Sequence, residues 1–200
     1  MRKNVLAGIG VGAALLGGAA FYYLREKAAE EPGYRALESD GDYQVRDYPA
    51  LSVAETVIRG PRKDALKGGY RILSDFLERA GLRFAVPVVQ DAGDPMASDP
   101  PLFDDELEGA WRTRFVMPES AALAEPPEGI ELVELPARKV AVVGFPGRPT
   151  DELLKAQEDR LRGWLARRGE TAAGEPEYAF YNSPLIPGPL RRNEVWLALS

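Results

Sequence analysis

Two stretches of the sequence decide the fold, and the first reads VRDYPALSVAETVIRG from Val45 to Gly60. The second reads VELPARKVAVVGFPG from Val133 to Gly147. Both are rich in β-branched residues, so each predicts an extended strand. Pro49 and Pro136 are 87 residues apart, as are the two glycines that close the stretches. Two such markers at one spacing indicate an internal repeat.

A helix is expected after each of these strands. Arg62–Ala80 carries apolar residues every three or four positions, and Gly81 follows as a residue that ends helices. Thr150–Arg168 begins with a good N-cap residue and has acidic residues in its first turn, which favour the positive end of the helix dipole. The apolar positions of the first helix are Leu66, Tyr70, Leu73, Phe76, Leu77 and Ala80.

Each half of the chain then ends in strands. In Trp111–Met117 apolar residues and Thr113 alternate with Arg112 and Arg114, which places the two arginines together on the other face. Tyr178–Tyr181 and Glu194–Leu199 have this role in the second half. We therefore expect an α+β domain whose halves, 43–118 and 130–200, are each ordered strand, helix, strand, strand. The halves should pair about a pseudo-twofold axis into a curved sheet or distorted β-barrel flanked by two long helices.

One segment departs from this pattern. Residues 90–109 hold seven acidic residues and three prolines, and they predict an exposed acidic loop. A Ca²⁺ site is the alternative interpretation, but the ordered carboxylate spacing of an EF-hand is absent.

The composition excludes several kinds of chemistry. The chain has 200 residues, a net charge of −6, and neither histidine nor cysteine. Zinc sites, cysteine nucleophiles, Ser-His-Asp triads and the usual His or Cys ligands of haem iron therefore have no candidates. Residues 1–27 carry a charge of +3, so residues 28–200 carry −9. Such an acidic domain is repelled by phosphate backbones, which argues against nucleic-acid binding.

The N-terminal segment predicts a membrane anchor. Val5–Leu24 is an uninterrupted run of 20 uncharged, mostly apolar residues, long enough to span a bilayer. A cleaved signal peptide is the alternative, but its apolar region is usually shorter and ends in small residues. The expected organisation is an anchor over 1–27, a linker over 28–42 and a domain over 43–200. We expect a single-pass protein of a bacterial inner membrane, with its domain facing the periplasm.

The soluble part resembles the SOUL family of haem-binding proteins. The resemblance runs in order from about Tyr43 to the C-terminus, and it rests on four segments: Val45–Thr56, Gly69–Phe76, Trp111–Pro118 and Tyr181–Trp196. It implies a distorted β-barrel of two pseudo-symmetric halves that binds haem or another tetrapyrrole non-covalently, in a shallow apolar groove beside the first helix. The chain departs from the family in one place, since a Met-Thr-x-Pro-Val-like segment is here Phe84-Ala-Val-Pro-Val-Val89.

The resemblance also implies which residues bind the ligand. Tyr70, Leu73 and Leu77, with Leu66 one turn earlier, are candidates for the apolar face against the macrocycle. Candidates for the basic groups that hold its propionates are Lys67, Arg71, Arg191 and Arg192. Gly68 and Gly69 are costly inside a helix, so either something packs closely there, such as a strand or a flat ligand, or the helix starts later.

The sequence leaves three hypotheses for function. The first is a membrane-anchored carrier of haem or a related tetrapyrrole that serves storage, buffering or transfer, with no His or Cys ligand to the iron and no catalytic step. The second is a general binder of flat apolar or cationic molecules, since the two-half fold resembles the effector-binding domains of drug-sensing regulators. The third, an enzyme using Tyr, Asp or Glu, lacks a pair of carboxylates whose spacing requires it. The sequence identifies no protein partner.

Overall fold

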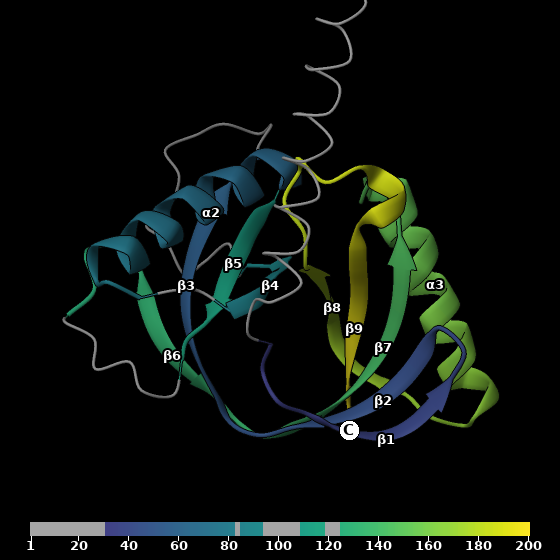
Figure 1. Ribbon diagram of the computed structural model, residues 1–200. Helices are drawn as coiled ribbons and strands as arrows, with labels where there is room; N and C mark the ends of the chain where they lie inside the picture. Colours follow the sequence, from purple (N-terminus) through teal and green to yellow (C-terminus); the bar gives the residue numbers. More distant parts are fainter. Residues whose placement is uncertain (1–30, 83–84, 94–108, 119–124) are drawn as a thin grey trace, which may run out of the picture.

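The computed structural model describes residues 31–82, 85–93, 109–118 and 125–200 (Figure 1). The expected anchor and most of the expected acidic loop lie outside these residues. Among the residues that the structure describes, no helix has both the length and the apolar composition needed to cross a membrane. The helices are α2 (Arg62–Arg79), α3 (Asp151–Arg167) and the short 3-10 helix η1 (Gly188–Leu190). The strands are β1 (Arg35–Asp40), β2 (Tyr43–Tyr48), β3 (Leu51–Arg59), β4 (Ala85–Ala92), β5 (Ala110–Val116), β6 (Glu131–Leu135), β7 (Arg138–Pro146), β8 (Ala172–Phe180) and β9 (Arg192–Leu199).

All nine strands form one antiparallel sheet in the order β1-β2-β7-β9-β8-β4-β5-β3-β6. The α+β class with two long helices is therefore confirmed. In the described part of the chain β1 and β6 each pair with one neighbour, so the strand order is that of an open sheet and not of a closed ring. The expected linker over 28–42 is wrong in part, since β1 lies within it and forms a hairpin with β2.

The two Pro-Ala pairs explain how this sheet curves. Only Pro49 and Ala50 separate β2 from β3, although these strands are the second and the eighth in the sheet. The connection from β6 to β7 is equally short. Tyr48 pairs with Arg138 and Leu51 with Leu135, so one antiparallel register continues through both connections. The sheet must bend strongly for its two ends to meet there, and this ribbon runs along the bottom of Figure 1.

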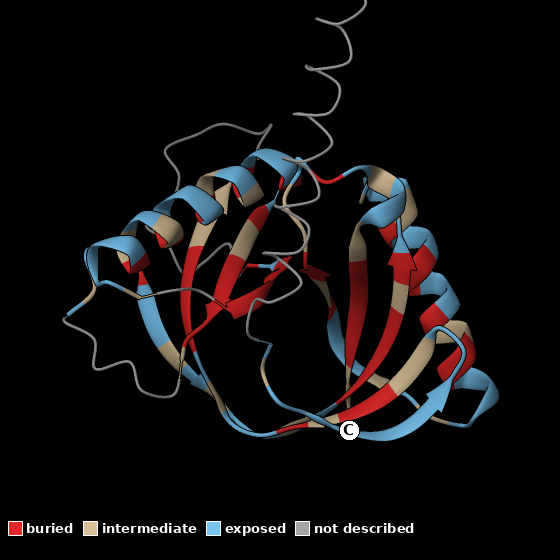
Figure 2. Cartoon of the chain, in the orientation of Figure 1, coloured by how far each residue is buried: buried red, intermediate tan, exposed pale blue. Residues whose placement is uncertain are grey.

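Both helices lie on the same face of the sheet, one over each half. The central strands show this because Val88 on β4 pairs with Phe180 on β8, and paired residues share a face. Val88 packs into the core under α2, whereas Phe180 packs into the core under α3. Buried positions follow the strands and the inner sides of the helices, while the outer sides of the helices are exposed (Figure 2).

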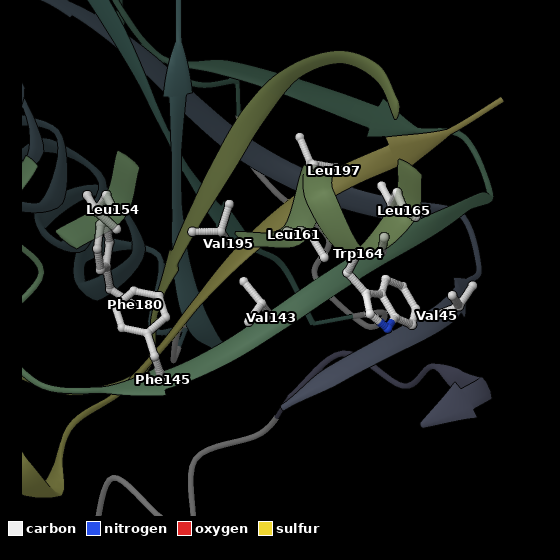
Figure 3. Packing of buried hydrophobic residues seen from close by; sticks show 11 residues of the cluster. Val45, Val143, Phe145, Leu154, Leu161, Trp164, Leu165, Phe180, Val195 and Leu197 are labelled. Atoms are coloured by element: carbon white, nitrogen blue, oxygen red, sulfur yellow. The ribbon is translucent and has the colours of Figure 1, made fainter. Parts of the chain in front are cut away.

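The two helices form where the sequence predicts them. The Thr150 hydroxyl accepts a hydrogen bond from the Leu153 N–H at 3.2 Å and caps α3 as expected. In the core beneath α3, Leu154, Phe145 and Phe180 lie together at one end and Trp164 lies near Val45 at the other (Figure 3). Burial of this apolar face is the main source of stability for the second half.

The glycine pair inside α2 marks a close contact between helix and sheet. A Cβ atom on Gly69 would lie 2.5 Å from the Thr113 hydroxyl on β5, and one on Gly68 would lie 2.7 Å from the Ile58 side chain on β3. Of the explanations that the sequence left open, close packing of strands is therefore the one observed.

Candidate functional site

The residues expected on the ligand-binding face of α2 divide into two groups. Leu73 and Leu77 are 0% and 1% exposed, and they pack against Ala54, Val88 and Phe115. These two leucines belong to the core, and a ligand cannot reach them in this arrangement.

The other residues of that group lie outward or at the edge of the core. Tyr70 is 42% exposed and makes an edge contact with the Phe115 ring at a centroid distance of 5.5 Å. Lys67 is exposed and bonds to Asp64 at 3.0 Å, Arg71 is exposed, and Leu66 is partly buried against the cores under both helices. The groove beside α2 therefore stays a prediction, and Leu73 and Leu77 cannot form its floor.

The two arginines of the closing motif lie elsewhere, on a pocket with a volume of about 420 Å³. The residues that line it come from the chain before β1, the β1–β2 hairpin, the end of β7 and the start of β9. They are Tyr34, Gly41, Asp42, Gln44, Arg46, Gly144, Phe145, Pro146, Arg191, Arg192 and Glu194. Arg192 and the residues of α2 thus lie on opposite faces of the sheet, so the structure does not bring the predicted basic groups together.

Strand register builds this pocket. On β2, Val45 faces the helices, so Arg46 next to it faces the opposite side. Gly144 on β7 pairs with Glu194 on β9, and its N–H donates to the Asp42 carbonyl at 2.9 Å. An added Cβ on Gly144 would find its nearest neighbour, the Asp42 carbonyl oxygen, 3.9 Å away. The missing side chain of Gly144 therefore leaves the space that larger neighbours surround.

Glu194 is the buried anion at the base of the pocket. It is 2% exposed and accepts six hydrogen bonds: two from Arg46, two from Arg192, one from the Tyr181 hydroxyl and one from the Trp196 ring N–H. Burial alone would raise the pKa of this carboxyl, but the hydrogen bonds and charge of Arg46 hold the pKa below its ordinary value. Glu194 is therefore an ionised and saturated structural group.

Aromatic rings enclose the two arginines that hold Glu194. The Arg46 guanidinium lies 4.3 Å from the centre of the Tyr34 ring, and that of Arg192 lies 3.8 Å from the Tyr181 ring. Burial raises the pKa of Tyr48, which bonds to Arg46, to about 12, and it raises the pKa of Tyr181 as well. Both hydroxyls stay protonated at neutral pH, so neither is a ready base.

Arg191 differs from the other arginines of the pocket. Its side chain donates to the backbone carbonyls of Ile186, at 2.7 Å, and Pro184. In the described part of the chain it has no carboxylate partner, whereas Arg46 is paired with Glu194 and Arg192 with both Glu194 and Glu31. Arg191 is thus the cation on this pocket whose charge is not already matched.

A second ionic network lies on the same face of the sheet. Arg114 bonds to Glu55 at 2.7 Å and to Asp91 at 2.9 Å, Arg112 also bonds to Asp91, and Arg138 bonds to Glu177. The prediction of one exposed acidic loop over residues 90–109 is therefore wrong at its start, since Gln90 and Asp91 are buried in β4. The physical reason is that Arg112 and Arg114, on the face expected from their alternation, neutralise Asp91.

These pairings limit what the face can bind. Every buried carboxylate in the described ranges, namely Glu55, Asp91, Glu158 and Glu194, has an arginine or lysine partner. The described residues also contain no group of three or more acidic side chains that could hold a metal ion. A cationic ligand would therefore find no unpaired buried carboxylate there.

Sequence reasoning identified Arg191 and Arg192 but missed Tyr34, Arg46, Gly144 and Glu194 as residues of one pocket. Glu194 belongs to the same closing motif as the two arginines. Arg46 and Gly144 carry no comparable signal, because only the register of β2, β7 and β9 brings them together.

Comparisons with known proteins agree with this architecture. A family model described as SOUL heme-binding protein matches residues 29–198. The crystal structure of the EcmrR C-terminal domain is 14% identical, with a TM-score of 0.60 over 84% of this chain and 98% of that chain. A hydrolase from Listeria innocua is 10% identical, with a TM-score of 0.54 over 82% of this chain and 94% of that chain. Both likenesses concern the fold alone. No match was found among curated proteins.

Proposed function

The chain belongs to the SOUL heme-binding protein family, and on that premise we propose that its domain binds haem or a related tetrapyrrole non-covalently, for storage, buffering or transfer. The proposal includes no catalytic step. It also includes the tether, in which residues 5–24 hold the domain at a bacterial inner membrane on the periplasmic side.

One observation carries the location of the ligand: Arg191 and Arg192, which the closing motif singles out, border the same pocket of about 420 Å³. This volume lies within the range of small-molecule sites, about 300–1,000 Å³, but the pocket is shallow and widely open to solvent, so it can hold only part of a porphyrin. The lining has three arginines against Asp42 and Glu194, a charge of +1 in a domain that is otherwise acidic. A propionate is best accommodated at Arg191, whose charge lacks a carboxylate partner among the described residues.

The walls of the pocket suit one edge of a flat ring. Tyr34 stands over Arg46 and is partly exposed, and Pro146 is exposed at the end of β7. Gly41 and Gly144 leave open space beside them, since an added Cβ would meet nothing at Gly41 within 4 Å and only the Asp42 carbonyl at Gly144. The macrocycle would place its propionate edge in the pocket and its apolar body against the rim.

The proposed binding depends on packing and on carboxylate contacts, because the sequence has neither histidine nor cysteine, the usual ligands of haem iron. We therefore expect metal-free protoporphyrin to bind within about fivefold of haem, a difference of about 1 kcal/mol. The test is a titration of the full chain in lipid nanodiscs, followed through the Soret band, with empty nanodiscs to correct for partition into lipid. Saturable binding near one ligand per chain is the expected result. A linear rise equal to that of empty nanodiscs contradicts the proposal.

The alternative is a general binder of flat apolar or cationic molecules. The overall acidity of the domain favours it, but the pairing of each described buried carboxylate counts against a cationic ligand. Competition between haem and a flat cationic dye separates the two functions. We expect the dye to leave haem binding unchanged, and displacement at equal concentration would favour the alternative.

A further inference from the structure

The loop between β8 and β9 exposes an apolar surface that the proposed pocket does not use. Leu185 and Leu190 are 71% and 55% exposed, the highest values among the large apolar side chains of the described residues. Pro184, Pro187 and Pro189 are exposed beside them. Single exposed leucines are common on protein surfaces, but this loop combines two of them with three exposed prolines, and we call it the apolar tip.

Hydrogen bonds hold this loop in a defined conformation. Ile186 is buried, its N–H donates to the Ser183 carbonyl at 3.0 Å, and the Arg191 side chain bonds to two loop carbonyls. The Gly147 N–H bonds to the Gly188 carbonyl at 3.0 Å, which fixes η1 against the end of β7. The two exposed leucines therefore belong to a braced loop, and this loop lies at the top of the molecule in Figure 1.

Two arginines lie beside this tip without a carboxylate partner among the described residues: Arg148, and Arg191, whose side chain bonds to the carbonyls of Ile186 and Pro184. Arg192 is already paired with Glu31 and Glu194. Arg148 is exposed and its side chain contacts η1, since it lies 3.3 Å from the position of a Cβ on Gly188. Exposed leucines beside arginines are the combination that anionic lipid surfaces attract.

The predicted membrane anchor is separated by only a few residues from a part of the chain that lies close to this loop. Glu31, the first described residue, accepts a hydrogen bond from Arg192 at 2.8 Å. Arg192 follows Leu190 and Arg191 directly in the sequence, so Glu31 lies close to the end of the loop. Only residues 25–30 separate it from the apolar run 5–24, and they reach at most about 25 Å when extended. An inserted run would hold this end of the domain close to the bilayer.

We propose that the loop Pro184–Leu190 docks on the surface of an anionic bilayer, with Leu185 and Leu190 in the interface and Arg148 beside the headgroups. The domain then stands with the mouth of the pocket at Arg191 towards the lipid. This orientation concerns the surface and not the ligand, so it stands or falls independently of haem binding.

The absence of native cysteine allows a clean test with the full chain. Leu185→Cys and Leu190→Cys are each labelled with an environment-sensitive fluorophore in liposomes of phosphatidylcholine and phosphatidylglycerol. Leu37→Cys on β1 and Leu132→Cys on β6 are the controls, since both side chains are also exposed and both strands lie at the side of the molecule away from the loop in Figure 1. Nitroxide-carrying lipids then report contact between label and bilayer.

We expect a blue shift and strong quenching at 185 and 190, and neither change at 37 or 132. Arg148→Gln should weaken the docking equilibrium about fivefold in anionic liposomes and leave it unchanged in neutral ones. Labels at 185 and 190 that are quenched no more than the controls would overturn the proposal. Burial of these labels without lipid quenching would overturn it as well, since it would mean that a protein surface covers the loop.

Discussion

The strongest consequence of the pocket architecture concerns Arg46, and the perturbation is Arg46→Met. Methionine keeps much of the length of the side chain but removes the two hydrogen bonds that Arg46 donates to Glu194, at 2.8 and 3.0 Å. Glu194, which is 2% exposed, then keeps Arg192, Tyr181 and Trp196 as partners. Removing one partner of a buried ion pair costs about 3–5 kcal/mol. Because Arg192 remains, we expect the lower end, about 3 kcal/mol of unfolding free energy.

The pH dependence gives this prediction its sign. In the native protein the pKa of Glu194 is below its ordinary value of 4.5, so its ionised form stabilises the fold above that pH, and this contribution is lost as the pH falls through the lowered pKa. Arg46→Met removes the hydrogen bonds and the charge of Arg46, which are the main causes that lower the pKa of Glu194, so we expect that pKa to rise in the variant. The variant should therefore be least stable, relative to the native protein, at neutral pH, and the difference should shrink as the pH falls towards 4.5.

Urea unfolding of the full chain, followed by tryptophan fluorescence, measures this difference directly. Arg46→Met with Glu194→Gln is the matched control, because it removes both charges and should recover most of the lost stability. A loss below about 1 kcal/mol at neutral pH, or additive effects of the two substitutions, would refute the reasoning.

Two further predictions concern the helix–sheet contact and the ligand. Gly69→Ala should destabilise the protein by about 1–3 kcal/mol, because its Cβ would lie 2.5 Å from Thr113. Gly163→Ala on α3 is the control and should stabilise the protein by about 0.5–1 kcal/mol, because its Cβ would meet only the Arg167 side chain, at 3.7 Å. Equal effects of the two substitutions in urea unfolding would contradict this packing. Arg191→Gln should weaken binding of a free-carboxylate porphyrin about 10- to 100-fold and leave the affinity for its dimethyl ester unchanged. Arg71→Gln on α2 is the control in the same titration. A larger loss of porphyrin affinity in that variant would indicate that the ligand binds in the groove beside α2.

The sequence predicts the helices and much of the sheet because their signals are local. Thr150 starts α3 and the alternation in Trp111–Met117 sets the faces of β5, and both depend on residues within a few positions. β1 was missed because Arg35–Asp40 has no alternating apolar pattern, all six residues being exposed. Its place in the sheet comes from pairing with β2.

The buried charges and the pocket could not be predicted from local patterns. Glu55 and Arg114 are 59 residues apart, and Arg46 and Glu194 are 148 apart. Whether a carboxylate such as Asp91 is exposed or neutralised depends on which strands become neighbours. The family resemblance identified Arg191 and Arg192, but only the register of β7 with β9 shows that Gly144 opens the space beside them.

The most direct test of the central claim, that this pocket holds the tetrapyrrole, is to fill it from within. Gly144 is not in the left-handed region and has room for a side chain, so Gly144→Val adds a β-branched residue to β7 without backbone strain. Ser52→Val on an exposed position of β3 is the matched control. In the Soret titration we expect Gly144→Val to weaken binding about tenfold or more at unchanged stability, and Ser52→Val to bind as the native protein does. Native affinity in a folded Gly144→Val protein would contradict the claim.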